Sequence, residues 1–270
     1  MQNRSSISLD EEIKQVQQQV KSEPSNGKYR VHLFQLYAQA SAWQKALAQL
    51  QIVAQLSADA ELLAYTYRAA IAAELLREEV FAGKRRPHVL GAKTDWVELI
   101  IDALAKQAAG DFAAASELRA QALELAPTVG GQMDQKAFAW LADADSRVGP
   151  VCELVLDGQY CWAAYDALAE VRLEKPQDLR DLVWLPAHVR LPDQEPRAAF
   201  MPARYAGASD ELIDGHKRSL LTTWAESPEG TWIGSGVRVL TTDTEEKSLL
   251  DVRHIEFLHQ PLEDGKAAVA

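Results

Sequence analysis

The feature that most constrains the fold is a change in hydrophobic periodicity near residue 130. Before it, apolar residues recur at steps of three and four, the period of an amphipathic helix. After it, short segments such as HVRL, VRVL and VRHIEF alternate apolar and polar residues, which is typical of half-buried strands. The glycines of TVGGQMDQ (128–135) interrupt both periods. The sequence therefore predicts an α+β protein, with a helical domain over residues 1–130 and a smaller, mainly antiparallel β-rich domain over residues 131–270.

The stretch GDFAAASELRAQALELAP (110–127) represents the helical half. One face of the predicted helix carries small and aliphatic residues, namely Ala115, Leu118, Ala122 and Leu125. Glu117, Arg119 and Glu124 lie off this stripe, so we expect them on the exposed side. Gly110 separates the segment from a periodic run over 96–109, and Pro127 ends it. The two segments therefore predict a helical hairpin.

The same stretch resembles the second helix of a tetratricopeptide repeat, in which small residues stand where two helices cross. A second copy, SAWQKALAQLQIVAQLSA (41–58), aligns Trp43 with Phe112 and Ala46 with Ala115. The copies are 69 residues apart, about twice the 34-residue repeat. Residues 61–83 keep the helical period without the signature. We interpret the first half as a TPR-like helical repeat with a degenerate middle; a generic α-helical bundle is the alternative.

Composition and charge exclude several classes of protein. Hydrophobic residues make up 47% and charged residues 25% of the chain, an ordinary globular mixture. The N-terminal residues lack the apolar core of a signal peptide, and no run reaches the roughly 18 apolar residues of a membrane span, so we expect a cytoplasmic protein. Residues 1–127 carry a net charge of −1 and residues 128–270 one of −10. Such an acidic second half disfavours binding to nucleic-acid phosphates.

Two cysteines flank a hairpin signal, Asp157-Gly158. If that pair forms a type I′ turn, Cys152 stands opposite Ala163 and only diagonal to Cys161. Diagonal neighbours lie about 7–8 Å apart, which suits a disulfide poorly. We therefore expect two reduced structural thiols.

Candidate catalytic residues are few. Asp143 and Asp145 form a D-x-D in FAWLADADSRVGP (138–150), and paired carboxylates of this kind can hold a divalent metal ion, so a metal-dependent enzyme is one hypothesis. The neighbouring Arg147 is an alternative partner for these carboxylates, which then belong to a structural hinge over 143–150. The histidines lack H-E-x-x-H spacing and no serine stands in a G-x-S-x-G elbow. The sequence offers no positive support for catalysis, a cofactor or a bound metal.

The helix predicted over 96–109 has two apolar faces. Val97, Ile100 and Leu104 share one face, whereas Leu99 and Ala103 share another that can pack on the helix 110–127. Because a hairpin needs only one apolar face, the first is either covered by the degenerate middle of the helical half or lines a groove that receives an amphipathic helix of a partner. Val97, Ile100 and Leu104 are therefore our candidate partner-binding residues.

Several motifs in register give the chain a family resemblance. They are LFQL (33–36), WQKALAQLQ (43–51), VFAGKRRP (80–87), FAWLADADSRVGP (138–150), LVLDGQYCW (154–162), DLRDLVWLPA (178–187) and PARY (202–205). In this order they resemble the ImpE/TagJ-type proteins, also called SciE, which are accessory components of bacterial type VI secretion systems. The resemblance spans roughly residues 30–257, and departs only in PARYAGASD, where such proteins are usually richer in Pro and Glu.

The resemblance implies a cytoplasmic, non-enzymatic adaptor. Proteins of this type are thought to bind TssB, the small subunit of the contractile sheath, and to act alongside the ClpV ATPase that recycles the sheath. A scaffold that binds only ClpV or the baseplate is a further alternative. No contact residue of the family is carried over to this chain.

Overall fold

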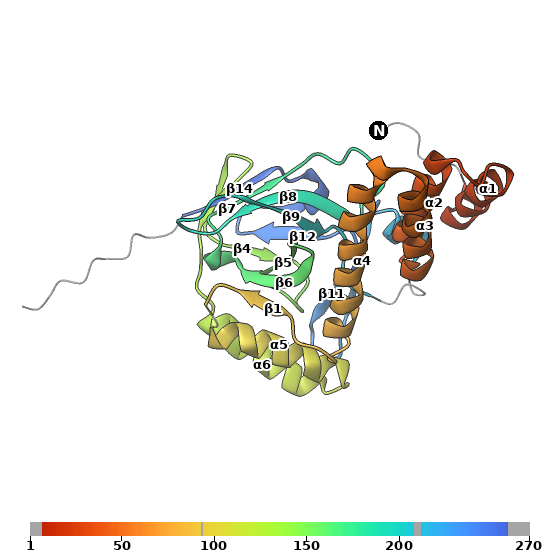
Figure 1. Ribbon diagram of the computed structural model, residues 1–270. Coiled ribbons are helices and arrows are strands. Elements are labelled where there is room, and N and C mark those ends of the chain that lie inside the picture. Colours follow the sequence, from red (N-terminus) through yellow and green to blue (C-terminus); the bar gives the residue numbers. More distant parts are fainter. Residues whose placement is uncertain (1–6, 93, 208–211, 259–270) are drawn as a thin grey trace, which may run out of the picture.

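The structure is a computed structural model and describes residues 7–92, 94–207 and 212–258 (Figure 1). The helical half contains α1 (Leu9–Ser22), α2 (Gly27–Gln39), α3 (Trp43–Leu56), the 3-10 turn η1 (Ala58–Ala60), α4 (Glu61–Phe81), the short strand β1 (His88–Leu90), α5 (Asp95–Ala108) and α6 (Phe112–Leu125). In Figure 1, α4 stands between α1–α3 and the sheet, and the α5–α6 hairpin lies along another side of the sheet. The predicted helical half and its α5–α6 hairpin are confirmed.

Local signals in the sequence set several of these helix ends. Ser8 and Glu11 form a capping box, in which the Ser8 hydroxyl accepts from the Glu11 N–H and the Glu11 carboxylate accepts from the Ser8 N–H. Gly83, with φ of +68°, ends α4, and the Lys84 N–H bonds back to the Glu79 carbonyl. Gly110, with φ of +81°, and the Asp111 side chain separate α5 from α6. These ends of α1, α4, α5 and α6 are thus set by residues close to them in the sequence.

The stripe predicted on α6 is only half right. Ala115 and Ala122 are fully buried, whereas Leu125 is 59% exposed and Arg119 only 6% exposed. Leu125 is the last residue of α6, and the backbone becomes extended at Ala126. Leu125 therefore stays exposed, and Val129, four residues later, is the buried apolar residue. Arg119 faces the strand-rich half, where its Nη1 donates to the Thr231 hydroxyl at 3.3 Å. The helix therefore contacts two neighbours, and periodicity alone revealed one of them.

The two aligned segments occupy matching places in their helices. Trp43 and Phe112 are the first residues of α3 and α6, and Ala46 and Ala115 are both fully buried. Helix α4, however, is a single element of 21 residues. The TPR-like relation between the two segments stays a prediction.

The strand-rich half begins with β2 at Gly131. Its elements are β2 (Gly131–Met133), β3 (Lys136–Phe138), β4 (Leu141–Asp143), β5 (Val151–Leu156), β6 (Gln159–Ala164), η2 (Tyr165–Ala167), β7 (Glu170–Leu173), β8 (Trp184–Arg190), β9 (Arg197–Pro202), α7 (Asp214–Lys217), β10 (Thr222–Glu226), β11 (Trp232–Gly236), β12 (Val239–Thr242), β13 (Glu246–Ser248), η4 (Leu249–Asp251) and β14 (His254–Phe257). A short helix near 210–215 was predicted; residues 208–211 lie outside the described residues, and α7 follows them. This half is no shorter than the helical half, contrary to the prediction.

The main sheet of the described residues has nine strands in the order β1-β6-β5-β9-β8-β7-β14-β2-β3. All neighbouring pairs are antiparallel except β1 and β6, which are parallel. Smaller sheets are formed by β10-β11 and by β13-β12-β4. The mainly antiparallel prediction is confirmed, but β1, which belongs to the helical half in sequence, is an edge strand of the main sheet.

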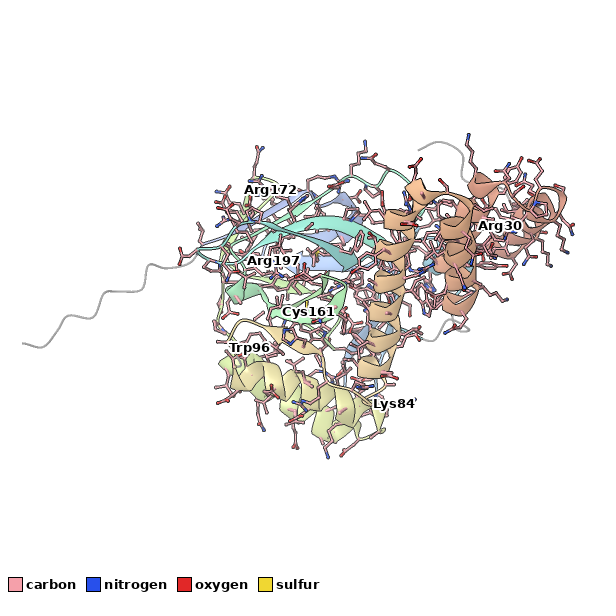
Figure 2. The ribbon with its side chains drawn as sticks, in the orientation of Figure 1. Arg30, Lys84, Trp96, Cys161, Arg172 and Arg197 are labelled. Carbon is pink, nitrogen blue, oxygen red and sulfur yellow. The ribbon has the colours of Figure 1, made fainter. Side chains whose placement is uncertain are left out.

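The β5–β6 hairpin matches its predicted register. Asp157 and Gly158 both have positive φ, as a type I′ turn requires, and Cys152 pairs with Ala163. Cys161 pairs with Leu154, and both thiols are free and buried. Figure 2 shows Cys161 within the molecule, on β6.

Hydrophobic clusters cross the boundary at residue 130. One cluster joins α1–α4 to Val183 and Trp184, which precede and begin β8. Another joins α4 and α5 to Trp162 on β6 and Val155 on β5. The helical half connects to the strand-rich half through the segment 126–130, between α6 and β2. The predicted hinge at 143–150 instead joins β4 to β5 within the strand-rich half. The two halves therefore share their cores.

Candidate functional site

A buried charged pair joins the helical half to the sheet. Arg77 of α4 donates from Nε and Nη2 to the two carboxylate oxygens of Glu153 on β5, at 2.7 and 2.9 Å. The two residues are 4% and 1% exposed. Burial by itself would raise the pKa of Glu153, but the charges of Arg77 and Arg238 and hydrogen bonds from Arg77 and Tyr160 lower it to about 2. Glu153 is therefore a carboxylate held in its charged form by two arginines.

The network continues into the strands around Glu153. Arg238, which follows β11 and is fully buried, donates from Nε and Nη2 to Asp143 Oδ2 at 2.8 and 2.6 Å. Its Nη1 lies 3.3 Å from Glu153 Oε2, an ion pair without hydrogen-bond geometry. The Tyr160 hydroxyl donates to Glu153 Oε1 and accepts from the Trp162 indole N–H at 2.6 Å. Such a connected polar network favours a single arrangement of α4 on the sheet.

The D-x-D carboxylates are structural anchors. Asp143 accepts from Arg238, and Asp145 accepts from Arg147 Nη2 at 2.6 Å and from the Gly234 N–H at 2.9 Å. The Arg147 guanidinium in turn lies 5.0 Å from the centre of the Phe81 ring on α4. Among the described residues no group of three or more His, Cys, Asp or Glu side chains could hold a metal ion; His259 lies outside them. The salt-bridge alternative for Asp145 and Arg147 is confirmed, and nothing supports the metal-dependent enzyme.

Arg204, from the PARY motif, ties together three segments. Its guanidinium donates to the carbonyls of Ala38 and Gln39 at the end of α2 and of Lys217 at the end of α7. Carbonyls at a helix end carry partial negative charge, so they suit a cation. Burial lowers the pKa of Arg204 to about 10. Arg204 therefore fixes α2 and α7 against the strand-rich half.

A cavity beside this arginine is too small for a substrate. Glu74, Arg77, Arg204 and Tyr205 line it, and its volume is about 20 Å³, which is room for about one water molecule. Burial raises the pKa of Glu74, although the Arg77 guanidinium lies 3.4 Å away. The cavity is a gap in a packed ionic network.

Three of the motifs behind the family resemblance contribute residues to this network. VFAGKRRP supplies Phe81, ADADSR supplies Asp143 and Asp145, and LVLDGQYCW supplies Tyr160. Sequence reasoning missed the central residues, which are Arg77, Glu153 and Arg238. Glu153 and Arg238 are charged residues within apolar runs, VCELVL and GVRVL, and a charge in such a run can indicate a buried ion pair. The alternation of apolar and polar residues does not by itself tell whether such a charge faces the core or the solvent.

The predicted partner-binding residues are not accessible. Val97, Ile100 and Leu104 are 1%, 1% and 3% exposed. They lie in the cluster that contains Val80 of α4 and Trp162 of β6. Helix α4 and the sheet therefore cover the α5 face that carries Val97, Ile100 and Leu104. Of the two alternatives for this face, the structure shows the one in which the protein itself covers it.

An accessible groove lies instead between α2 and α3. It has a volume of about 690 Å³ and is lined by Asn26, Gly27, Lys28, Val31, His32, Gln35, Val53, Leu56, Ser57 and Ala60. Leu56, the last residue of α3, is 41% exposed. The chain then enters α4, whose first turns expose Leu62 and Tyr65, each by 75%. Exposed apolar side chains beside a groove are typical of protein-interaction surfaces.

Fold and site together define an α+β protein in which buried ion pairs join the helical half to the sheet. The protein also has an open, partly apolar groove between α2 and α3. No helix among the described residues combines the length and the apolar character of a bilayer span. The model of the ImpE protein family matches residues 135–256. The chain is also 41% identical over 249 residues to the type VI secretion system accessory component TagJ of Pseudomonas aeruginosa, covering 92% of this chain and 87% of that protein.

The protein therefore belongs to the ImpE/TagJ family. The fold has a solved counterpart in the crystal structure of protein VPA1032 from Vibrio parahaemolyticus, with a TM-score of 0.86, 19% identity, and coverage of 93% of this chain and 94% of that one. At that identity the likeness concerns the fold alone.

Proposed function

We propose that this protein is a non-enzymatic accessory protein of a bacterial type VI secretion system, and that it binds an amphipathic helix of the small sheath subunit TssB in the cytoplasm. The observation that carries the accessory role is the 41% identity with TagJ along most of both chains. Sheath binding and work alongside ClpV are the finer part of the proposal. They rest on the family resemblance and on the presence of a surface that suits a helix.

The groove between α2 and α3 is the proposed docking surface. Helix-in-groove recognition needs an apolar floor between helices, and Val31 and Leu56 provide partly exposed apolar side chains along this groove, beside the buried Val53. Val97, Ile100 and Leu104, the candidates suggested by periodicity, could meet a partner only if α5 left the sheet. The fully buried Ile100 makes that movement expensive in lost hydrophobic burial.

Two exposed leucines allow a matched test of the groove. Leu56 and Leu125 each end a helix, α3 and α6, and are 41% and 59% exposed. Truncating an apolar anchor in a partly desolvated groove costs about 2 kcal/mol, so Leu56→Asp should weaken binding to a synthetic TssB helix by about 30-fold. Leu125→Asp should bind as the wild type does. Because the contact is apolar, affinity should change little between low and high salt.

Each other outcome contradicts part of the proposal. Equal affinities of Leu56→Asp and wild type would place the helix on another surface, while leaving the adaptor role intact. Failure of the TssB helix and of purified full-length TssB to bind the wild type would refute the adaptor role itself. Binding of ClpV in the same assay without TssB would favour the scaffold alternative.

A further inference from the structure

Strand β10 has an open edge. In an antiparallel pair, alternate residues direct their N–H and C=O groups toward the partner strand, and the residues between them direct these groups outward. β10 pairs with β11 on one side only. In the described segments, no backbone–backbone hydrogen bond from another element reaches residues 222–226. Four of the five residues of β10 are exposed, so its outward groups face solvent.

The other side of this hairpin is anchored to the protein. The Ser146 N–H donates to the Trp232 carbonyl at 3.0 Å, and the Trp232 N–H donates to the Ser146 hydroxyl at 3.2 Å. The Gly234 N–H donates to Asp145 at 2.9 Å. Figure 1 shows β11 outside the nine-stranded sheet, and Arg119 of α6 contacts Thr231 beside it. Hydrogen bonds to Ser146 and Asp145 therefore hold β11 in place, and β10 pairs with β11 and keeps its other edge free.

Other sheet edges of the molecule carry features that discourage strand pairing. β1, β3, β4 and β13 are each three residues long, and β3 and β13 contain Lys136 and Lys247. Short edge strands and lysines are the usual protection against pairing with another chain. β10 is five residues long, TTWAE, and contains neither lysine nor proline. It is the least protected of these edges.

One face of the hairpin carries aromatic and acidic side chains. Trp224, Glu226 and Trp232 lie on the same face, because Trp232 pairs with Glu226 and Trp224 is two residues before it. Trp224 and Trp232 are 38% and 49% exposed, and the Trp224 ring packs on the Tyr205 ring with 5.5 Å between the ring centroids. Glu226 and the nearby Glu229 take part in no ion pair among the residues that the structure describes.

We propose that β10 is a second interaction surface, which binds an extended segment of a partner protein as an added strand. The added segment would hydrogen-bond to the outward groups of β10, place apolar side chains beside Trp224, and place a lysine or arginine beside Glu226. Charge complementarity argues for a basic segment, since the exposed glutamates are unpaired and residues 128–270 carry a net charge of −10. This surface is separate from the α2–α3 groove and does not depend on the proposed sheath partner.

The test uses a defined probe, a nine-residue fluorescent peptide that alternates lysine and valine, titrated with the full-length protein by fluorescence anisotropy. A second peptide replaces lysine by glutamate, and a third carries N-methyl groups on consecutive backbone nitrogens, which block both edges of the peptide strand. Glu226→Lys reverses the charge on β10. Glu256→Lys is the matched control, because Glu256 is exposed on β14, whose two neighbours in the sheet leave no free edge.

The lysine peptide should bind wild type and Glu256→Lys equally, and the N-methylated peptide should bind at least about tenfold more weakly, because several backbone hydrogen bonds are lost. Glu226→Lys should bind the lysine peptide at least about fivefold more weakly and should prefer the glutamate peptide. Equal binding of the N-methylated peptide, equal binding by Glu226→Lys, or no binding of the lysine peptide would each overturn the proposal. A dimer in sedimentation analysis that Glu226→Lys abolishes would assign the edge to a second copy of this chain and also overturn it.

Discussion

Replacing Glu153 by glutamine should destabilise the protein strongly, because Glu153 is the buried carboxylate on which two arginines converge. The substitution keeps the side-chain shape and removes the charge. Glu74, at 3.4 Å, is then the carboxylate left to Arg77, whose Nη2 also donates to the Arg204 carbonyl at 2.9 Å, and Arg238 retains Asp143. Breaking a buried ion pair by removing one partner costs about 3–5 kcal/mol, since it leaves an uncompensated buried charge. This is a large part of the roughly 5–15 kcal/mol that stabilises a typical domain.

The measurement is urea unfolding of wild type and Glu153→Gln, followed by circular dichroism, with thermal melting as a second readout. For a chain of this size each kcal/mol lowers the melting temperature by about 2–4 °C, so a decrease of about 6–20 °C is expected. Glu256→Gln makes the same chemical change at an exposed position and should stay within about 0.5 kcal/mol of wild type. A loss below about 1 kcal/mol for Glu153→Gln would refute the reasoning.

A double variant separates the charge from the packing. Replacing both partners by apolar residues of similar volume, Arg77→Met with Glu153→Leu, removes the uncompensated charge and should recover more than half of the loss. If the double variant is as unstable as the sum of the single variants, then side-chain packing at this position matters more than charge compensation.

The pH dependence has a definite sign. The pKa of Glu153 is lowered from an ordinary 4.5 to about 2, so its contribution to stability is fully present above pH 4.5 and is lost as pH falls toward 2. Burial raises the pKa of Glu74 and of Asp143, and these groups act in the opposite direction. The difference in stability between wild type and Glu153→Gln should therefore shrink between pH 4.5 and 2. A constant difference over this range would contradict the assignment.

Three further predictions follow from buried groups. Ala115→Leu should cost about 1–3 kcal/mol by overpacking the α5–α6 crossing, whereas the exposed control Glu117→Ala should melt like wild type; equal melting temperatures would mean that the crossing is loose. Asp145→Ala should lower stability to the same extent with and without Mg²⁺ or Mn²⁺, because it leaves the Arg147 guanidinium without its carboxylate, and stoichiometric metal binding abolished by the substitution would instead support a metal site. Cys152 and Cys161 should resist a thiol reagent until the protein unfolds, since burial raises the pKa of both thiols to about 12; rapid labelling in native buffer would be inconsistent with the packing of β5 on β6.

Several features of the molecule were determined by short-range sequence signals. Gly110, Asp111 and the run of small residues after them specify the α5–α6 hairpin, because capping and helical periodicity act within a few residues. Asp157 and Gly158 specify the β5–β6 turn and, through it, the register that keeps Cys152 away from Cys161. The family resemblance likewise came from linear motifs.

Only the tertiary structure decided how these elements meet. Arg77 and Glu153 are 76 residues apart, and Asp143 and Arg238 are 95 apart, so no local pattern could pair them. Periodicity identified Ile100 as apolar, but it could not tell whether a partner or the protein's own sheet covers it. The physical reason is that a residue's propensity depends on its neighbours in sequence, whereas burial and ion pairing depend on which distant segment occupies the adjacent space. Sequence thus determined the elements and the family, and packing determined which surfaces remain free to bind.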